Sequence, residues 1–210
     1  MTFDKDDRKR PQLRLVVNNP DKTSAHPQTD EIFIPFQELC AMRDSMRPDF
    51  YRSLDHRQTR IYVALERFLA AREWPFGLDH QHGPLMVLPA EAVCPEAGHG
   101  EGEQPDEIII YAAEDAVGEG FCLSLEMILP FYSEDESVME DALLYSPVFQ
   151  YGALFLEENR QDQFLDLIYR IGIPIYPPAP TSRVLARLFT IASFELKEAL
   201  QTLAEYSEGL

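Results

Sequence analysis

The chain has few cysteines and no long apolar run, and both shortages exclude classes of protein. Its three cysteines, Cys40, Cys94 and Cys122, form no CxxC pair, which favours reduced thiols over a disulfide framework. No apolar run approaches the roughly 20 residues of a membrane helix. The N-terminus also lacks the apolar stretch typical of a signal peptide. We therefore expect a soluble, cytoplasmic protein.

Basic residues are missing from the middle of the chain. No Lys or Arg lies between Arg72 and Arg160, and that stretch holds 19 Asp and Glu residues. The formal net charge of the 210 residues is -18. Nucleic-acid binding depends on basic side chains that displace counterions, so we expect no direct nucleic-acid binding. A basic partner protein is allowed, and so is an acidic surface that serves solubility alone. Seven arginines between positions 43 and 72 are candidates to pair with the acidic stretch.

The chain has enough apolar and aromatic residues to form a hydrophobic core. The chain is 45% hydrophobic and 11% aromatic, which excludes disorder of the whole chain. Residues 1–30 mix charges with prolines and are interpreted as a flexible charged tail. Residues 31–58 are interpreted as a helical extension, with a helix from Phe36 that should stop near Met46 because of Pro48. Residues 59–210 are predicted to form one α+β domain.

The pattern of apolar residues predicts the elements of that domain. A helix is expected from Thr59 to Trp74, then strands at Leu85–Leu88, Ile108–Tyr111 and Phe121–Phe131. The third strand has apolar residues at every second position, which suits an antiparallel sheet covered on one side only.

The second half of the domain follows the same reasoning. Ser133 and Glu136 form a capping box before a helix from about Glu134 to Tyr145. Two apolar segments, Tyr151–Leu156 and Phe164–Ile171, predict a hairpin. A proline-rich connector from Ile173 to Pro180 and a last helix capped by Thr181 complete the chain. The predicted fold is thus α+β, with a five-stranded, mostly antiparallel sheet flanked by helices.

This order of elements resembles the type III secretion chaperone-like fold, which secretion chaperones of the Tir-chaperone type share with YbjN-like proteins. The likeness is strongest in the stretch VMEDALLYSPVFQYGALFLEENRQDQFLDLIYRIGIPI, where a helix leads into a glycine-containing strand, an acidic turn and a second strand. It spans roughly residues 59–206. Residues 1–58 and the long loop at residues 90–105 depart from the pattern.

The resemblance implies a dimeric protein without catalytic activity. Secretion chaperones wrap an extended client segment around their surface, and YbjN-like members are described as regulators. We therefore expect a non-enzymatic chaperone or regulatory adaptor that holds a protein partner through apolar grooves with an acidic rim, forms a homodimer and uses no cofactor. Aromatic and unassigned apolar residues are the candidate contacts, although core packing is an alternative for the aromatic ones. The candidates are Trp74, Ile128, Tyr151, Tyr176 and Phe194.

Two other functions stay open. An acidic protein of this kind could occupy the basic groove of a nucleic-acid-binding protein as a mimic of nucleic acid. The cluster of Asp79, His80 and His82, with Cys94 and His99 downstream, could instead hold a metal ion in a sensor, although a solvated turn explains the same residues. No motif for nucleophilic catalysis is present, so the chain is not expected to be an enzyme.

Overall fold

The computed structural model describes residues 34–80, 83–97, 106–114, 120–131, 136–144, 149–158, 165–176 and 179–208. The predicted tail, residues 1–30, lies outside these ranges. From the second helix onward the predicted order of elements is confirmed, with one strand and two short helical turns added. The elements in chain order are α1 (Phe36–Ser53), α2 (His56–Ala70), β1 (Gly77–Asp79), β2 (Leu85–Pro89), α3 (Ala90–Val93), η1 (Pro95–Ala97), β3 (Glu107–Glu114), β4 (Phe121–Ile128), α4 (Glu136–Ala142), β5 (Gly152–Glu158), β6 (Leu165–Ile175) and α5 (Ser182–Glu208).

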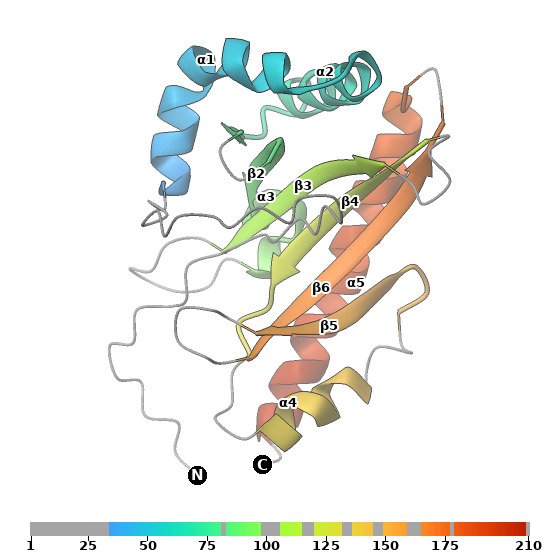
Figure 1. The fold of residues 1–210 in the computed structure, drawn as a ribbon. Coiled ribbons are helices and arrows are strands. Elements are labelled where there is room, and N and C mark those ends of the chain that lie inside the picture. Colours follow the sequence, from blue (N-terminus) through green and yellow to red (C-terminus); the bar gives the residue numbers. More distant parts are fainter. Residues whose placement is uncertain are drawn as a thin grey trace, which may run out of the picture.

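All six strands form one antiparallel sheet in the order β1-β2-β3-β4-β6-β5 (Figure 1). The predicted α+β class, with an antiparallel sheet flanked by helices, is confirmed. The predicted number of five strands is wrong, because β1 adds a sixth strand beside β2. A strand of three residues is too short to show an alternation of apolar and polar positions, so β1 could not be predicted from the sequence pattern.

One face of the sheet packs against α2, α4 and α5 and forms the main core. Figure 1 shows α5 running along the sheet behind β4 and β6. The rings of Phe68 in α2 and Phe189 in α5 stack with their centroids 5.2 Å apart, which joins the two helices. The predicted alternation in β4 is confirmed, and the residues buried on this face are Phe121, Leu123, Leu125 and Met127.

The other face, called the second face here, is covered at one end. Helix α1 packs over β1 and β2, where Leu39 lies so close to Gly77 that a side chain there would clash with it. The expectation of a sheet covered on one side only is therefore wrong at this end. It is also wrong in the middle, where Ser124 and Glu126 of β4 are buried. Side chains of the neighbouring strands contact Glu126 there, as described below.

Helix α1 continues through Pro48, so its predicted end near Met46 is wrong. A proline inside a helix removes one backbone hydrogen bond and bends the axis, and Figure 1 shows α1 changing direction along its length. Buried apolar side chains on both sides of Pro48 compensate for the lost hydrogen bond. Met46 is buried, and Phe50 is fully buried with its ring edge-on to Tyr62 of α2, 5.1 Å between centroids.

Other boundaries differ by a few residues. Helix α4 is shorter than predicted, and Ser133 of the expected capping box lies outside the described residues. The connector does not begin at Ile173, because β6 continues to Ile175 with Pro174 opposite Cys122. The predicted cap of α5 is confirmed, since the Val184 N–H donates to Thr181 Oγ1 at 3.3 Å.

None of the helices within the described ranges combines the length and apolarity needed to cross a membrane. The division of the chain at residues 30 and 58 stays a prediction.

Candidate binding site

Strand β5 ends the sheet, and within the described ranges only β6 pairs with it. In Figure 1 this edge lies at the end of the sheet opposite α1 and α2. An edge strand presents backbone N–H and C=O groups to which an extended segment can add as a further strand. The open side of β5 is therefore the first element of the candidate site.

The beginning of β5 is fixed by a buried carboxylate. Glu195 of α5 is only 4% exposed and accepts hydrogen bonds from the backbone N–H groups of Gln150, Tyr151 and Gly152, at 2.9, 2.9 and 2.8 Å. The Tyr169 hydroxyl donates to the same carboxylate at 2.8 Å. Burial, followed by the nearby Glu195, raises the pKa of that hydroxyl. The edge strand thus starts from a rigid point.

An apolar row crosses the second face next to this edge. The strand register pairs Ile128 of β4 with Ile168 of β6, and Ile168 with Phe155 of β5. Phe155 is 40% exposed, Ile128 is partly exposed and Ile168 is buried between them. The row, called the apolar row here, gives an added segment a surface for its side chains.

Charged groups lie beside the apolar row. Arg170 of β6 places its guanidinium over the Phe155 ring, 4.7 Å from the centroid, and donates from Nε to Glu126 Oε1. The Tyr111 hydroxyl donates to the same oxygen. Burial and then Glu126 raise the pKa of Tyr111. Because Arg170 contacts both Glu126 and Phe155, it holds the Phe155 ring, the most exposed side chain of the apolar row, in place.

The far end of β5 is acidic. Glu157 and Glu158 end the strand, and Asp166 of β6 lies opposite Glu157 in the register. The carboxylates of Glu157 and Asp166 at this end of the edge attract a basic residue of a partner and repel an acidic one. The predicted acidic rim stays a prediction, and these two residues are candidates for it at β5.

The structure brings only two of the five predicted contact residues to this site. Ile128 belongs to the apolar row, and Tyr151, which is 51% exposed, directly precedes β5. Trp74 lies elsewhere, partly buried against the main core, with its ring edge-on to Phe68 and Phe189. Its role as a contact residue stays a prediction.

The remaining two predicted residues are exposed but lie elsewhere. Phe194 is the more exposed, at 65%, and sits on α5, behind the sheet. Tyr176 follows the end of β6 and lines a pocket next to α2. Neither contributes to the β5 edge.

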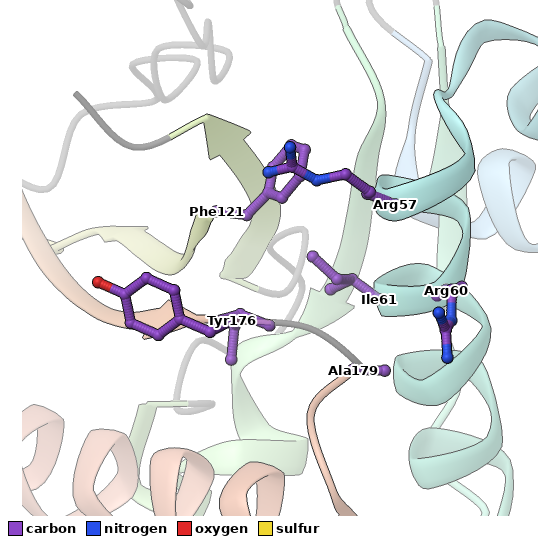
Figure 2. A pocket seen from close by; sticks show the side chains of 7 residues that line it. Arg57, Arg60, Ile61, Phe121, Tyr176 and Ala179 are labelled. Carbon is purple, nitrogen blue, oxygen red and sulfur yellow. The ribbon is translucent and has the colours of Figure 1, made fainter. Parts of the chain in front are cut away.

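That pocket lies between the first turns of α2, the start of β4 and the end of β6 (Figure 2). Arg57 and Arg60 are its charged residues. The Arg57 guanidinium lies 4.8 Å from the centroid of the Phe121 ring, and its Nε is buried without a hydrogen-bond partner. The residues that line the pocket are Arg57, Arg60, Ile61, Phe121, Ile175, Tyr176 and Ala179.

The predicted pairing of the arginines with the acidic stretch is not what the structure shows for three of the seven. Arg43 pairs with Asp44 at 3.5 Å, Arg52 with Asp49 at 2.5 Å, and Arg47 with Glu66 of α2 at 2.5 Å. All three acids belong to the same arginine-rich segment. Helices place residues three or four positions apart side by side, and neighbouring helices bring their own charges together.

The candidate metal cluster is only partly within the described residues. Asp79 is buried at the end of β1 and His80 follows it, whereas His82 and His99 lie outside the described ranges. Cys94 is buried, with its Sγ 3.6 Å from a carboxylate oxygen of Glu96. Within the ranges that the structure describes, no three His, Cys, Asp or Glu side chains gather as ligands.

Glu107 of β3 lies at the covered end of the second face. The residue before α1, Pro35, provides no side-chain cap, and the Phe36 N–H donates to the Glu107 carboxylate. Burial raises the pKa of Glu107 to about 7; the hydrogen bond from Phe36 opposes this shift, and the charge of Asp106 adds to it. The Glu107 carboxyl group, with its pKa near 7, thus lies beside the first residue of helix α1.

Sequence reasoning missed Phe155, Arg170 and Arg57. The alternation of β5 would have placed Phe155 opposite Leu154 and Leu156, but its exposure depends on which strand ends the sheet. Arg57 was counted only as one of seven arginines, and its contact with Phe121 links residues 64 positions apart. A local pattern carries no signal for either.

No protein-family model matches the chain, and no curated protein matches it. Among solved structures, the chain is similar to YbjN from E. coli, described as a candidate transcription regulator. The sequence identity is 13% and the TM-score 0.44, over 68% of this chain and 90% of that chain. The predicted YbjN-like resemblance is thereby confirmed as a likeness of fold, and no residue role is transferred from it.

Proposed function

We propose that the chain is a non-enzymatic protein-binding module, of chaperone or regulatory-adaptor type, that holds an extended segment of a partner along β5. The observation that carries this proposal is the exposed Phe155, set in the apolar row beside the open edge of the sheet. The likeness of fold to YbjN does not support this proposal.

The geometry supports a segment of particular chemistry. Backbone hydrogen bonds to β5 give an added strand its affinity, and side chains at alternate positions give it specificity. Residues of the segment that point toward the second face lie beside Phe155 of β5, so they should be apolar. A Lys or Arg is expected at the end of the segment that lies beside Glu157.

Selection from a library of random peptides against the full chain tests this proposal. We expect enriched peptides to alternate apolar and polar residues and to carry Lys or Arg near one end. Phe155→Ser should weaken the best peptide about tenfold or more, because a buried aromatic anchor contributes most of the affinity at such a site. Fluorescence anisotropy of the labelled peptide measures the change.

Phe194→Ser is the matched control, because Phe194 is an even more exposed aromatic on α5. It should leave peptide affinity unchanged. The proposal is wrong if Phe194→Ser abolishes binding while Phe155→Ser does not. Thermal unfolding of both variants separates a lost contact from a lost fold.

The salt dependence separates this function from the acidic mimic. Binding through the apolar row should largely survive between about 0.1 and 0.5 M salt, whereas a complex led by charge should collapse as screening shortens to a few ångströms. The homodimer, the cytoplasmic location and the metal-dependent sensor stay predictions.

A further inference from the structure

Residues 8–17, with the sequence RKRPQLRLVV, have the chemistry that the β5 edge requires of an added strand. They hold four of the chain's 18 Lys and Arg residues and no acidic residue. Leu13, Leu15 and Val17 occupy alternate positions, so in an extended strand they point to one side. The three basic residues at positions 8–10 precede them. This stretch, called the basic segment here, therefore combines an apolar side with a positive end.

The basic segment lies outside the described ranges, which begin at residue 34. No other stretch outside those ranges combines an apolar run with basic residues. The chain thus carries one sequence of its own that fits the chemistry of the β5 edge.

Strand β5 offers the matching groups in the matching order. Phe155 is 40% exposed on the second face, and Glu157 follows two residues later on the same face, opposite Asp166 of β6. An added strand places its side chains beside those of the edge strand on the same face. The apolar side lies beside Phe155 and the positive end beside Glu157 only if the segment runs antiparallel to β5. All pairs of strands in the described sheet are antiparallel as well.

The described chain begins on the second face, level with the apolar row. The Phe36 N–H donates to the Glu107 carboxylate, and Figure 1 shows the beginning of α1 near the beginning of β3. The register of β3 with β4 places Glu107 level with Ile128, which belongs to the apolar row. The row ends at Phe155 on β5. The N-terminal residues therefore enter the fold at one end of the row, and the open edge lies at the other.

The residues between the basic segment and α1 are long enough to reach that edge. Strands β4 and β6 separate β3 from β5, so the distance across the sheet is about 15 Å at about 4.8 Å per strand. Residues 18–33 span up to about 50 Å when extended. A segment linked over such a length has an effective concentration on the order of millimolar at its site. A weak affinity is therefore sufficient for occupancy.

We propose that the basic segment binds to the open edge of β5 in its own chain. Leu13, Leu15 and Val17 lie on the second face beside Phe155, and the positive end lies beside Glu157. A partner has to displace this segment, so the chain itself controls access to β5. The inference rests on the proposed function, because both take β5 as a site for extended segments.

A labelled peptide of residues 8–19, RKRPQLRLVVNN, tests the contact by fluorescence anisotropy. The recipient is the full chain with Leu13→Ser, Leu15→Ser and Val17→Ser together, so that its own segment no longer competes. We expect a dissociation constant on the order of 0.1 mM, and about tenfold weaker binding to the unchanged chain, because the linked segment is present at an effective millimolar concentration. Adding Phe155→Ser to the recipient should weaken binding about tenfold.

Two variants are the controls for this measurement. Phe194→Ser in the recipient should leave peptide affinity unchanged, since Phe194 lies on α5. Phe3→Ser in the unchanged chain alters an apolar residue near the basic segment but outside it, and should not improve peptide binding. Equal affinity of the peptide for the recipient and the unchanged chain would overturn the proposal.

Hydrogen exchange of the full chain, followed by NMR, tests the contact within one molecule. Exchange at residues 13–17 should be about tenfold slower in the unchanged chain than in the triple serine variant, in keeping with the same occupancy. Fast exchange at these residues in both proteins contradicts the proposal. Slow exchange that appears only as the protein concentration rises contradicts it too, because a second copy then supplies the segment.

The failure of this inference can be distinguished from the failure of the proposed function. If selected library peptides bind at Phe155 with equal affinity to the unchanged chain and the triple serine variant, the inference is wrong and the proposed function stands. If residues 13–17 are protected from exchange but no library peptide is enriched against either protein, the segment covers β5 and the proposed function is wrong.

Discussion

The two faces of the sheet each bury one carboxylate at 4% exposure, but they satisfy it differently. On the packed face, Glu195 is held by three backbone N–H groups and a tyrosine hydroxyl. On the second face, Glu126 is held by two side chains, Arg170 and Tyr111. Backbone donors cannot turn away from the carboxylate, whereas side chains can. The packed face is therefore the rigid support, and the second face keeps the freedom that a binding surface needs.

The largest effect expected from this comparison concerns the two carboxylates themselves. Glu195→Ala should lower the free energy of unfolding by about 3–5 kcal/mol, because it leaves several buried donors without acceptors. Glu126→Ala should cost only about 1–2 kcal/mol, since Arg170, whose side chain is 38% exposed, can turn toward water. Urea unfolding of both variants measures the difference. Equal losses would contradict the distinction between backbone and side-chain support.

Two glycines extend the comparison with a smaller effect. At Gly152 on the packed face, an added Cβ would lie 2.6 Å from the Tyr169 ring and 2.8 Å from Glu195 Oε2. Gly152→Ala should therefore destabilise the protein by about 2–3 kcal/mol through overpacking. Thermal unfolding, together with the NMR signals of residues 150–152, measures the effect.

Gly172→Ala on the second face is the matched variant. Its Cβ would lie 2.8 Å from Cys122 Sγ and 3.2 Å from Ser124 Oγ, both ends of side chains that can rotate. The gain of alanine over glycine within a strand, about 0.5–1 kcal/mol, offsets part of the crowding. The net change should stay below about 1 kcal/mol. A larger loss for Gly172→Ala than for Gly152→Ala would show that the second face is the less tolerant one.

The last effect concerns pH at the covered end of the second face. The pKa of Glu107 is raised from 4.5 to about 7, so the folded state holds this proton more tightly than the unfolded state does. The contribution of Glu107 to stability is therefore complete below pH 4.5 and is lost as the pH rises through about 7. Each unit of pKa shift corresponds to about 1.4 kcal/mol, so Glu107→Gln should remove up to about 3 kcal/mol of pH dependence across this window.

Urea unfolding of Glu107→Gln and the unchanged chain at several pH values checks that prediction. Other carboxyl groups titrate in both proteins, so the difference between the two curves isolates Glu107. Parallel curves would mean that the start of α1 is not sensitive to this proton.

Sequence patterns predicted those parts of the fold that depend on local periodicity. The alternation from Phe121 placed the packed face of β4 correctly, and the helical stripe of Ile61, Leu65 and Phe68 placed α2. They failed where a distant contact decides the local structure. Phe50 packs against Tyr62 and carries α1 past Pro48, and β1 exists only because β2 pairs with it.

The candidate site was less predictable than the fold. Ile128 was identified because no stripe used it, and its place in the apolar row depends on the register with β6. The exposure of Phe155 depends on the strand order. Strand β6 lies between β4 and β5, which leaves β5 at the edge of the sheet. Trp74 and Phe155 are both aromatic residues in apolar surroundings, and only the packing of distant elements places one against the core and leaves the other exposed.

The position of β6 between β4 and β5 also sets the order of events during synthesis on the ribosome. Until residues 165–175 have emerged, β4 is the edge of an unfinished four-stranded sheet, with Phe121, Leu123, Leu125 and Met127 still lacking the cover of α5. Such edges recruit strands from other nascent chains, and a charge within the strand opposes that recruitment. Glu126, in the middle of β4, can then protect the nascent chain until Arg170 arrives to pair with it.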